Sequence, residues 1–199
     1  MTSPVSGSGR TLGGMTAEYV LPVPRDGLTW DDLQAIPDEA HHHYELIEGQ
    51  ILMSPSPGLH HQRCVFNLAL ALRQAASPEF EVILAPFDFN PEPGTVLQPD
   101  VLVIRRGTAE AQRVVVPPVL AIEVLSPSHP TVDRVTKRAL YARFGIEHYW
   151  LVDPAGPAIE VLRRDGLGYV DVVAVTGGDT LHVDAPFELA VSPSALTDD

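Results

Sequence analysis

Three apolar segments that follow one another in the middle of the chain favour a fold built around a central sheet. The segments are FEVILAPFDF (residues 80–89), TVLQPDVLVI (95–104) and PVLAIEVLS (118–126). Each is dense in residue types that are enriched in β-strands, and the loops between them carry proline, glycine or charged residues. We therefore expect three strands that are neighbours in one sheet.

Helical segments lie on both sides of these strands. Apolar residues recur every three or four positions after His60 and predict an amphipathic helix that ends before Pro78. These apolar residues are Val65, Leu68, Ala69, Leu72 and Ala76. A second helix is expected over residues 131–145 (TVDRVTKRALYARFG), with Thr131 as its N-terminal cap and Gly145 at the position where helices commonly end.

The remaining segments predict a short helix and further strands. The short helix is expected over residues 29–36 (TWDDLQAI), and a strand pair over residues 44–54 (YELIEGQILMS). A further strand is expected over residues 148–154 (HYWLVDP), followed by a hairpin over residues 158–175. From His60 the order is therefore helix, three strands, helix and strand, which predicts an α/β (α+β) fold with a strand pair added before it and a hairpin after it.

We expect a single domain over residues 26–195, because no internal repeat or linker divides this range. Residues 1–25 are rich in glycine, serine, threonine and proline without periodicity, which is typical of a flexible leader. No apolar run approaches the roughly 20 residues of a membrane-spanning helix, and no signal peptide is evident. The lone Cys64 cannot form an internal disulfide, so we expect a cytoplasmic protein without a membrane segment.

The charge of the chain is acidic overall but unevenly distributed. With 26 acidic and 13 basic residues among 199, the formal net charge is −13, which argues against a protein that coats nucleic acid nonspecifically. Residues 101–164 nevertheless carry 9 basic and 6 acidic side chains, and a polyanion would prefer this segment. Charge alone does not separate a binding patch from arginines scattered over a solvated surface.

Two of the apolar segments contain a carboxylate. Asp100 lies between LQP and VLVI, and Glu123 lies between VLAI and VLS. An unpaired carboxylate in apolar surroundings costs several kcal/mol, so each could instead sit at a solvent-facing strand end or pair with an arginine. If the two strands are neighbours, both carboxylates converge on one edge, where a hard cation such as Mg²⁺ would relieve their repulsion.

The order of short motifs along the chain resembles a known protein family. The motifs are YELIEG at 44–49, His61-Gln62, QPD at 98–100, IEVLSPS at 122–128, Asp133 with Lys137, Tyr141, Gly145 and YWLVDP at 149–154. Together they resemble the Uma-two family of restriction-endonuclease-like proteins, within the PD-(D/E)XK nuclease superfamily, over about residues 28–192. The resemblance implies a restriction-endonuclease-like core, with a central mixed sheet flanked by helices, which matches the order of elements read from the sequence.

The resemblance also assigns roles to individual residues. It implies that Asp100 and Glu123 bind a divalent metal, Mg²⁺ or Mn²⁺, with the carbonyl of Val124 as a further ligand. The lysine that the wider superfamily has two residues after the glutamate is Leu125 here. Lys137 on the following helix is the expected substitute.

Three of the implied site residues have alternative interpretations. Lys137 could form an i, i+4 salt bridge with Asp133, although it is the only lysine beside twelve arginines, and arginine would serve equally well in a surface ion pair. Glu45, matched as an additional acidic catalytic residue, could be a strand-surface carboxylate. His61, matched as a phosphate-binding residue, could be a helix cap or a surface imidazole.

We therefore expect this protein to be a metal-dependent endonuclease that hydrolyses phosphodiester bonds of nucleic acid, with DNA as the expected substrate. Asp100, Glu123, Lys137 and Glu45 would be the catalytic residues. A homodimer is expected, because cutting both strands of a duplex with one site per chain is most simply done by a two-fold pair. The alternative is a catalytically inert nuclease-fold module for binding or assembly, which is consistent with Leu125 and with the acidic surface.

Overall fold

The computed structural model describes residues 27–36, 42–126 and 131–198. The leader predicted for residues 1–25 and the end of the IEVLSPS motif lie outside these residues. The helical elements are α1 (Trp30–Gln34), α2 (Leu59–Ala75), the π-helical segment η1 (Val132–Lys137), α3 (Arg138–Arg143) and α4 (Pro193–Thr197). The strands are β1 (His42–Ile47), β2 (Gln50–Pro55), β3 (Phe80–Leu84), β4 (Asp88–Glu92), β5 (Thr95–Leu97), β6 (Val101–Arg105), β7 (Arg113–Val114), β8 (Leu120–Val124), β9 (His148–Asp153), β10 (Ala158–Asp165), β11 (Gly168–Thr176), β12 (Leu181–Val183) and β13 (Leu189–Val191).

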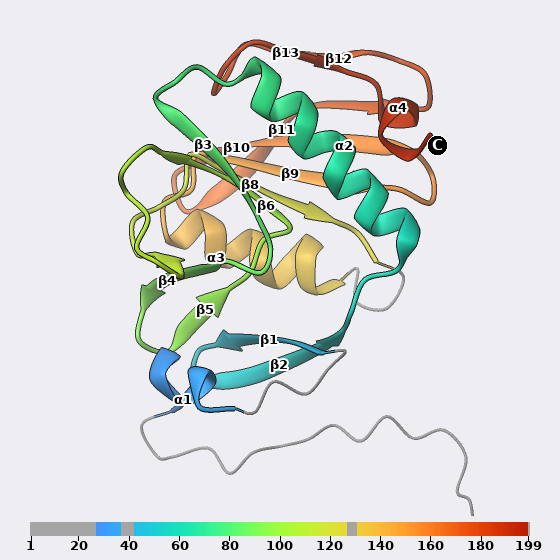
Figure 1. Ribbon diagram of the computed structural model, residues 1–199. Coiled ribbons are helices and arrows are strands. Elements are labelled where there is room, and N and C mark those ends of the chain that lie inside the picture. The colour runs from blue at the N-terminus through green and yellow to red at the C-terminus, as the bar shows by residue number, and fades with distance from the viewer. Residues whose placement is uncertain (1–26, 37–41, 127–130, 199) are drawn as a thin grey trace, which may run out of the picture.

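A six-stranded sheet in the order β11-β10-β9-β8-β6-β3 forms the centre of the fold. Strands β8 and β9 are parallel and the other pairs are antiparallel, so the sheet is mixed, as the family resemblance implies. Helix α2 lies on one face, and η1 with α3 lies on the other (Figure 1). The hairpin expected at residues 158–175 is β10 with β11.

The alternation of side chains along β8 decides which face Glu123 occupies. Ile122 and Val124 pack with the α2 face of the sheet, whereas Ala121 and Leu125 pack with α3. Because successive side chains of a strand point to opposite faces, Glu123 points toward η1 and α3. The only charged residue of β8 is thereby directed to the side of the sheet that carries Lys137.

Two of the three apolar segments are each divided between two sheets, which corrects the expectation of one strand per segment. The segment 80–89 forms β3 and β4, and the segment 95–104 forms β5 and β6. Pro86 and Pro99 lie at the divisions, and a proline lacks the N–H that a central strand needs. Strands β3 and β6 consequently belong to the central sheet, and β4 and β5 belong to the second sheet. Strands β3, β6 and β8 are neighbours in the central sheet, as expected.

The second sheet has the order β2-β1-β5-β4-β7 and includes the predicted N-terminal strand pair. It lies beside the central sheet at the end where α1 is found (Figure 1). Strand β1 pairs with β2 along its whole length and with β5 through Leu46 and Val96. The chain passes from β5 to β6 through Gln98, Pro99 and Asp100, so the QPD motif connects the two sheets.

The three predicted helices are present, but the one expected over residues 131–145 begins differently from the prediction. Helix α1 begins with a capping box between Thr29 and Asp32, and α2 spans the predicted periodic segment. Thr131 makes no capping hydrogen bond, because its own φ of −72° and ψ of −32° are helical and not the extended values of a cap. A π-helical segment follows, and Gly145 ends α3 with a φ of 84°. No helix of the described residues is long and apolar enough to cross a membrane.

The turn between β1 and β2 connects the N-terminal hairpin to its neighbours through Gly49. The N–H of Gly49 donates to the carbonyl of Gly94 at 2.8 Å, and its carbonyl accepts from the N–H of Leu28 at 3.0 Å. Gly49 has a φ of 80°, and a Cβ at this position would lie 2.8 Å from the Cα of Gly27. Only glycine fits this close approach without strain.

We expect Gly49→Ala to destabilise the protein by about 1–3 kcal/mol, because the substitution adds left-handed strain and a backbone clash. Gly178→Ala is the matched control, since the φ of Gly178 is not left-handed and a Cβ added there would have no atom within 4 Å. The control should change stability by less than about 0.5 kcal/mol. Urea unfolding measures both, and equal losses in the two variants would contradict the prediction.

Candidate active site

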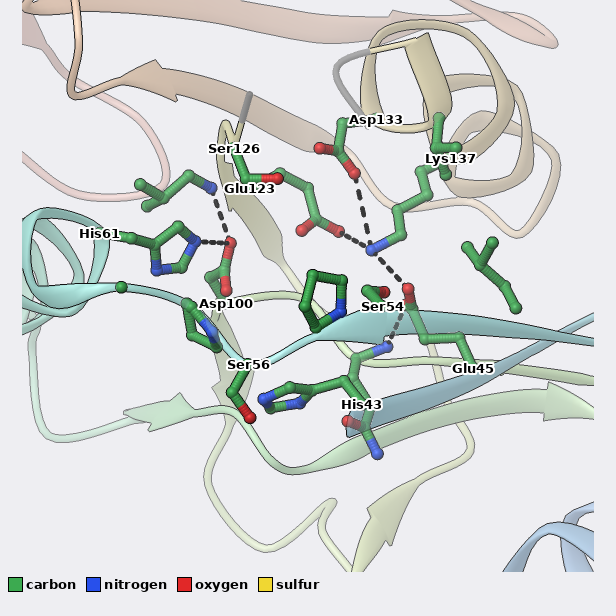
Figure 2. A pocket seen from close by; sticks show the side chains of 17 residues that line it. His43, Glu45, Ser54, Ser56, His61, Asp100, Glu123, Ser126, Asp133 and Lys137 are labelled. Atoms are coloured by element: carbon green, nitrogen blue, oxygen red, sulfur yellow. Dashed lines mark hydrogen bonds and ion pairs between the residues drawn. The ribbon is translucent and has the colours of Figure 1, made fainter. Parts of the chain in front are cut away.

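A pocket of about 320 Å³ lies where the two sheets meet η1 and the start of α2. Its lining contains all the site residues predicted from the sequence, and Figure 2 shows them pointing toward one another. These residues are Glu45, His61, Asp100, Glu123 and Lys137. They come from β1, α2, the β5–β6 connection, β8 and η1, so the site is assembled from five separate parts of the chain.

Asp100 and Glu123 lie side by side because β6 and β8 are antiparallel neighbours. Val101 pairs with Ile122, which brings the preceding Asp100 next to Glu123. Oδ2 of Asp100 accepts a hydrogen bond of 2.8 Å from the backbone N–H of Val124. Oε1 of Glu123 accepts hydrogen bonds from the hydroxyl of Tyr141 at 2.6 Å and from Nζ of Lys137 at 3.0 Å.

Lys137 is the buried centre of a cluster of carboxylates. Its Nζ lies 2.9 Å from Oε2 of Glu45, 3.0 Å from Oε1 of Glu123 and 3.6 Å from Oδ1 of Asp133. The residue is only 5% exposed. The i, i+4 contact with Asp133 is therefore present, but it is the longest of the three contacts and belongs to the pocket rather than to the surface. An ammonium with three N–H groups matches three separate carboxylates better than a planar guanidinium would.

Glu45 is a buried residue and not a strand-surface carboxylate. It is 4% exposed on β1, where Oε2 faces Lys137 and Oε1 accepts a hydrogen bond of 2.8 Å from the backbone N–H of Gln98. The residue that follows Gln98 and Pro99 is Asp100, so the same short connection holds Glu45 and presents Asp100. Glu45 thus links the N-terminal hairpin to the central sheet through the pocket.

A supporting group behind Gln98 is not among the residues expected from the sequence. Asp88 is 4% exposed, and its Oδ1 accepts a hydrogen bond of 2.8 Å from the side chain of Gln98. Its Oδ2 accepts one of 2.6 Å from Nε1 of Trp30. Asp88 interrupts the apolar segment 80–89 just as Asp100 and Glu123 interrupt theirs, so the same signal could have identified it.

His61 contacts the site residue Asp100 and does not cap the helix. Its Nε2 lies 3.2 Å from Oδ2 of Asp100, whereas Gly58 occupies the cap position of α2. Nδ1 of His61 is buried and has no hydrogen-bond partner among the described residues. Burial alone would lower the pKa of His61, but the hydrogen bond and the negative charge of Asp100 raise it above its usual value.

The pocket carries more negative than positive charge. Burial, reinforced by the neighbouring carboxylates, raises the pKa of Glu123 well above its ordinary value, although Lys137 opposes this. Burial likewise raises the pKa of Asp133 to about 6. Burial disfavours the charged form of Lys137, but Glu123, Glu45 and Asp133 together raise the pKa of its ammonium. The lysine therefore stays protonated at neutral pH and can donate hydrogen bonds but cannot act as a base.

The donor set suits a hard divalent cation that keeps several waters. Within the described residues the polar contacts of Asp100 use Oδ2 and those of Glu123 use Oε1, so Oδ1 and Oε2 retain lone pairs. No group of three or more histidine, cysteine, aspartate or glutamate side chains in this part of the chain is arranged to hold a metal ion. Mg²⁺ does not need such a cage, because one or two carboxylates with waters and substrate oxygens commonly hold it.

Comparison with known families agrees with the motif order. The family model Uma2, described as "Putative restriction endonuclease", matches residues 30–196. The chain belongs to the Uma2 family. A search of curated proteins found no match.

A solved structure supports the Uma2 fold. It is a crystal structure from Anabaena variabilis of a "putative nuclease belonging to DUF820", and it is similar to this chain with a TM-score of 0.70 and 20% identity. The match covers 85% of this chain and 97% of that chain. At this identity the likeness shows the fold, and the restriction-endonuclease-like architecture expected from the sequence is confirmed.

We expect Asp133→Asn to stabilise this Uma2 protein above neutral pH. Because the pKa of Asp133 is raised to about 6, its ionisation disfavours the folded state, and the penalty develops between about pH 4 and pH 6. Without metal the variant should be more stable than the parent by about 1–3 kcal/mol at pH 8, and the gain should disappear as the pH falls to about 4. Urea unfolding across this pH range measures the difference, and a loss of stability at pH 8 would show that the carboxylate is needed by Lys137.

Proposed function

We propose that this protein is a divalent-metal-dependent endonuclease that hydrolyses phosphodiester bonds of nucleic acid, with DNA as the expected substrate. The observation that carries the proposal is the position of the Lys137 ammonium, 3.0 Å from Glu123 and in the same pocket as Asp100. Two adjacent carboxylates can hold a metal ion that activates water, and a buried, protonated amine beside them can stabilise the charge that develops during phosphodiester hydrolysis. The family and the similar crystal structure point to the same class of reaction.

Asp100 and Glu123 would hold the metal, Mg²⁺ or Mn²⁺. Bound there, a divalent cation supplies Lewis-acid activation of the scissile phosphate and of a water nucleophile. Asp100 is held in position by the N–H of Val124, and Glu123 by Tyr141, so neither carboxylate has to move to face the pocket. This preorganisation reduces the free energy needed to assemble the site.

The positive charge of Lys137 would stabilise the negative charge that develops on a phosphate oxygen, and the N–H that faces Asp133, its longest contact at 3.6 Å, would turn to the attacking water or to that oxygen. The pKa of Lys137 is raised, so the lysine supplies charge and hydrogen bonds and does not remove a proton. Glu45 acts as a positioning residue, because it contacts Nζ at 2.9 Å and is itself held by the N–H of Gln98. His61 lines the same pocket and contacts Asp100 through Nε2, so it would orient that carboxylate beside a bound phosphate.

The position of Leu125 favours an active enzyme over the inert binding module. Leu125 lies on the same face of the sheet as Glu123 and packs with Leu140 and Tyr141. A lysine at position 125 would therefore approach the site from the strand, whereas here the amine of Lys137 reaches Glu123 from η1. An ammonium group is therefore present beside Glu123, although it comes from position 137 and not from position 125.

Asp100→Asn should abolish metal binding with a change in stability of less than about 1 kcal/mol, because asparagine can still accept the hydrogen bond of Val124 and relieves carboxylate repulsion. The test is the melting temperature as a function of Mn²⁺ concentration, which rises when the ion binds the folded state. Asp171→Asn is the matched control, since that side chain is 82% exposed. The parent and the control should show the same upward shift. A shift of equal size in Asp100→Asn would exclude Asp100 as a ligand.

Lys137→Arg should lower the single-turnover cleavage rate at saturating nucleic acid by about 10² or more, because the guanidinium keeps the charge but cannot occupy the position of the ammonium. The buried position also predicts a loss of stability of about 1–3 kcal/mol from overpacking. Arg134→Lys is the control, since Arg134 forms a half-exposed ion pair with Glu160 outside the pocket lining. A Lys137→Arg rate within threefold of the parent, measured below its unfolding temperature, would remove Lys137 from the mechanism.

A further inference from the structure

We infer that the pocket takes a single flexible strand of nucleic acid and discriminates against a continuous duplex. This inference rests on the proposed nuclease function and specifies its substrate class. It is carried by two observations that concern different parts of the molecule. One is the depth and size of the pocket, and the other is the pairing of the arginines on the surface.

The proposed reacting groups lie deep in a small pocket. Glu123 is 3% exposed and Lys137 is 5% exposed, and only the Asp100 side chain, at 19%, is more accessible. The volume of about 320 Å³ is at the lower end of the roughly 300–1,000 Å³ that sites for small molecules have. A space of this size suits one nucleotide and not a length of double helix.

A duplex and a single strand differ in how they can present a phosphate to such a pocket. Duplex DNA is stiff, with a persistence length of about 150 base pairs, and its phosphates are fixed on the outside of a wide cylinder. A single strand can bend sharply and extend one phosphate and its base away from its neighbours. Only the flexible strand can bring a phosphate next to Asp100 and Glu123 without opening the pocket.

The walls of the pocket offer histidine and serine side chains in place of a cationic groove. The hairpin β1–β2 contributes His43 and Ser54, the residues after it contribute Ser56, and the first turn of α2 contributes His61 (Figure 2). No arginine is among the described lining residues, and Lys137 is surrounded by carboxylates. Such walls can hydrogen-bond a sugar, a base or one phosphate, but they cannot follow the backbone of a duplex.

Most arginines of residues 101–164 do not supply the positive charge that the pocket lacks for binding a duplex. In the basic segment 101–164, six of the eight arginines form ion pairs with carboxylates. They are Arg105, Arg106, Arg113, Arg134, Arg138 and Arg143. Each pair is worth only about 0–1 kcal/mol and can open, but its carboxylate stays nearby and cancels the local positive field. The expectation that a polyanion would prefer this segment is therefore weakened, because duplex binding depends on neutralising many phosphates.

The strand preference can be measured with end-labelled oligonucleotides of one sequence, in Mn²⁺ and under single-turnover conditions. The substrates are a single strand, its fully paired duplex, and a duplex with an unpaired bubble at its centre, each prepared as DNA and as RNA. For DNA, for RNA or for both, we expect the single strand to be cut about 10²-fold faster than the duplex of the same nucleic acid. Cuts in the bubble substrate should fall within the unpaired region. Asp100→Asn should cut none of them.

The salt dependence of binding provides a second measurement. With the unmutated protein and Ca²⁺ in place of Mn²⁺, so that the strand is bound but not cut, the logarithm of the single-strand affinity should fall with the logarithm of the salt concentration with a slope of about −2 or shallower. A protein that neutralises 6–10 phosphates gives a much steeper slope. A steep slope would contradict capture by a pocket that lacks a cationic groove.

The outcomes separate the two proposals. Cutting of the duplex at a rate within threefold of the single strand would overturn the strand preference and leave the nuclease function standing. Failure to cut any substrate, or equal cutting by Asp100→Asn, would overturn the nuclease function and the strand preference together. If the preference holds, a two-fold dimer is no longer required by the reaction, because only one strand is cut.

Discussion

The buried ammonium of Lys137 holds the two sheets of this protein together at one point. It contacts Glu45 of the N-terminal hairpin, Glu123 of the central sheet and Asp133 of its own helical segment. Removing a cation from water costs several kcal/mol, and only close carboxylates can offset that cost. The hairpin, the sheet and η1 must therefore meet at this distance for the folded state to be stable, so the site geometry follows from the packing of the whole domain core.

The same cluster carries the negative charge that the proposed cation would neutralise. Three carboxylates surround one ammonium, and Asp100 adds a fourth carboxylate at the edge of the sheet. The raised pKa values of Glu123 and Asp133 express this excess of negative charge in a buried place. A divalent cation would neutralise the negative charge that the lysine leaves unbalanced, so the electrostatic imbalance that destabilises the protein is also what would attract the metal.

The segment η1 supplies the amine beside Glu123. In the wider superfamily that the sequence resembles, a lysine two residues after the glutamate on the same strand would supply it. Because Leu125 is apolar, the amine near Glu123 has to come from another element, and the π-helical segment presents Lys137 and Asp133 to the pocket together. Segments of this kind are frequent at functional sites, since their irregular hydrogen bonding redirects side chains. On the other side of Glu45, the indole N–H of Trp30 donates to Asp88, the side chain of Gln98 donates to the same Asp88, and the backbone N–H of Gln98 donates to Glu45. The arrangement of the pocket therefore depends on residues as distant as helix α1.

Local patterns were sufficient to predict much of the framework. The periodicity after His60 predicts α2, the alternation through Glu123 sets the face on which that carboxylate lies, and the motif order identifies the family. These features depend on neighbours within a few positions, and the sequence states them directly. The division of two apolar segments at Pro86 and Pro99 was missed, because apolar composition does not reveal to which sheet a strand belongs.

The identity of the charged residues and their local direction can be read from the chain alone, whereas the groups that surround them depend on the three-dimensional packing. Asp100 and Glu123 stand out in apolar strands because burying a lone charge is costly wherever it occurs. That Glu45 is buried, that Lys137 is shared among three carboxylates, and that most arginines of residues 101–164 are already paired depend on contacts between distant segments. Such contacts leave no periodic trace in the chain, because they are set by how whole elements pack.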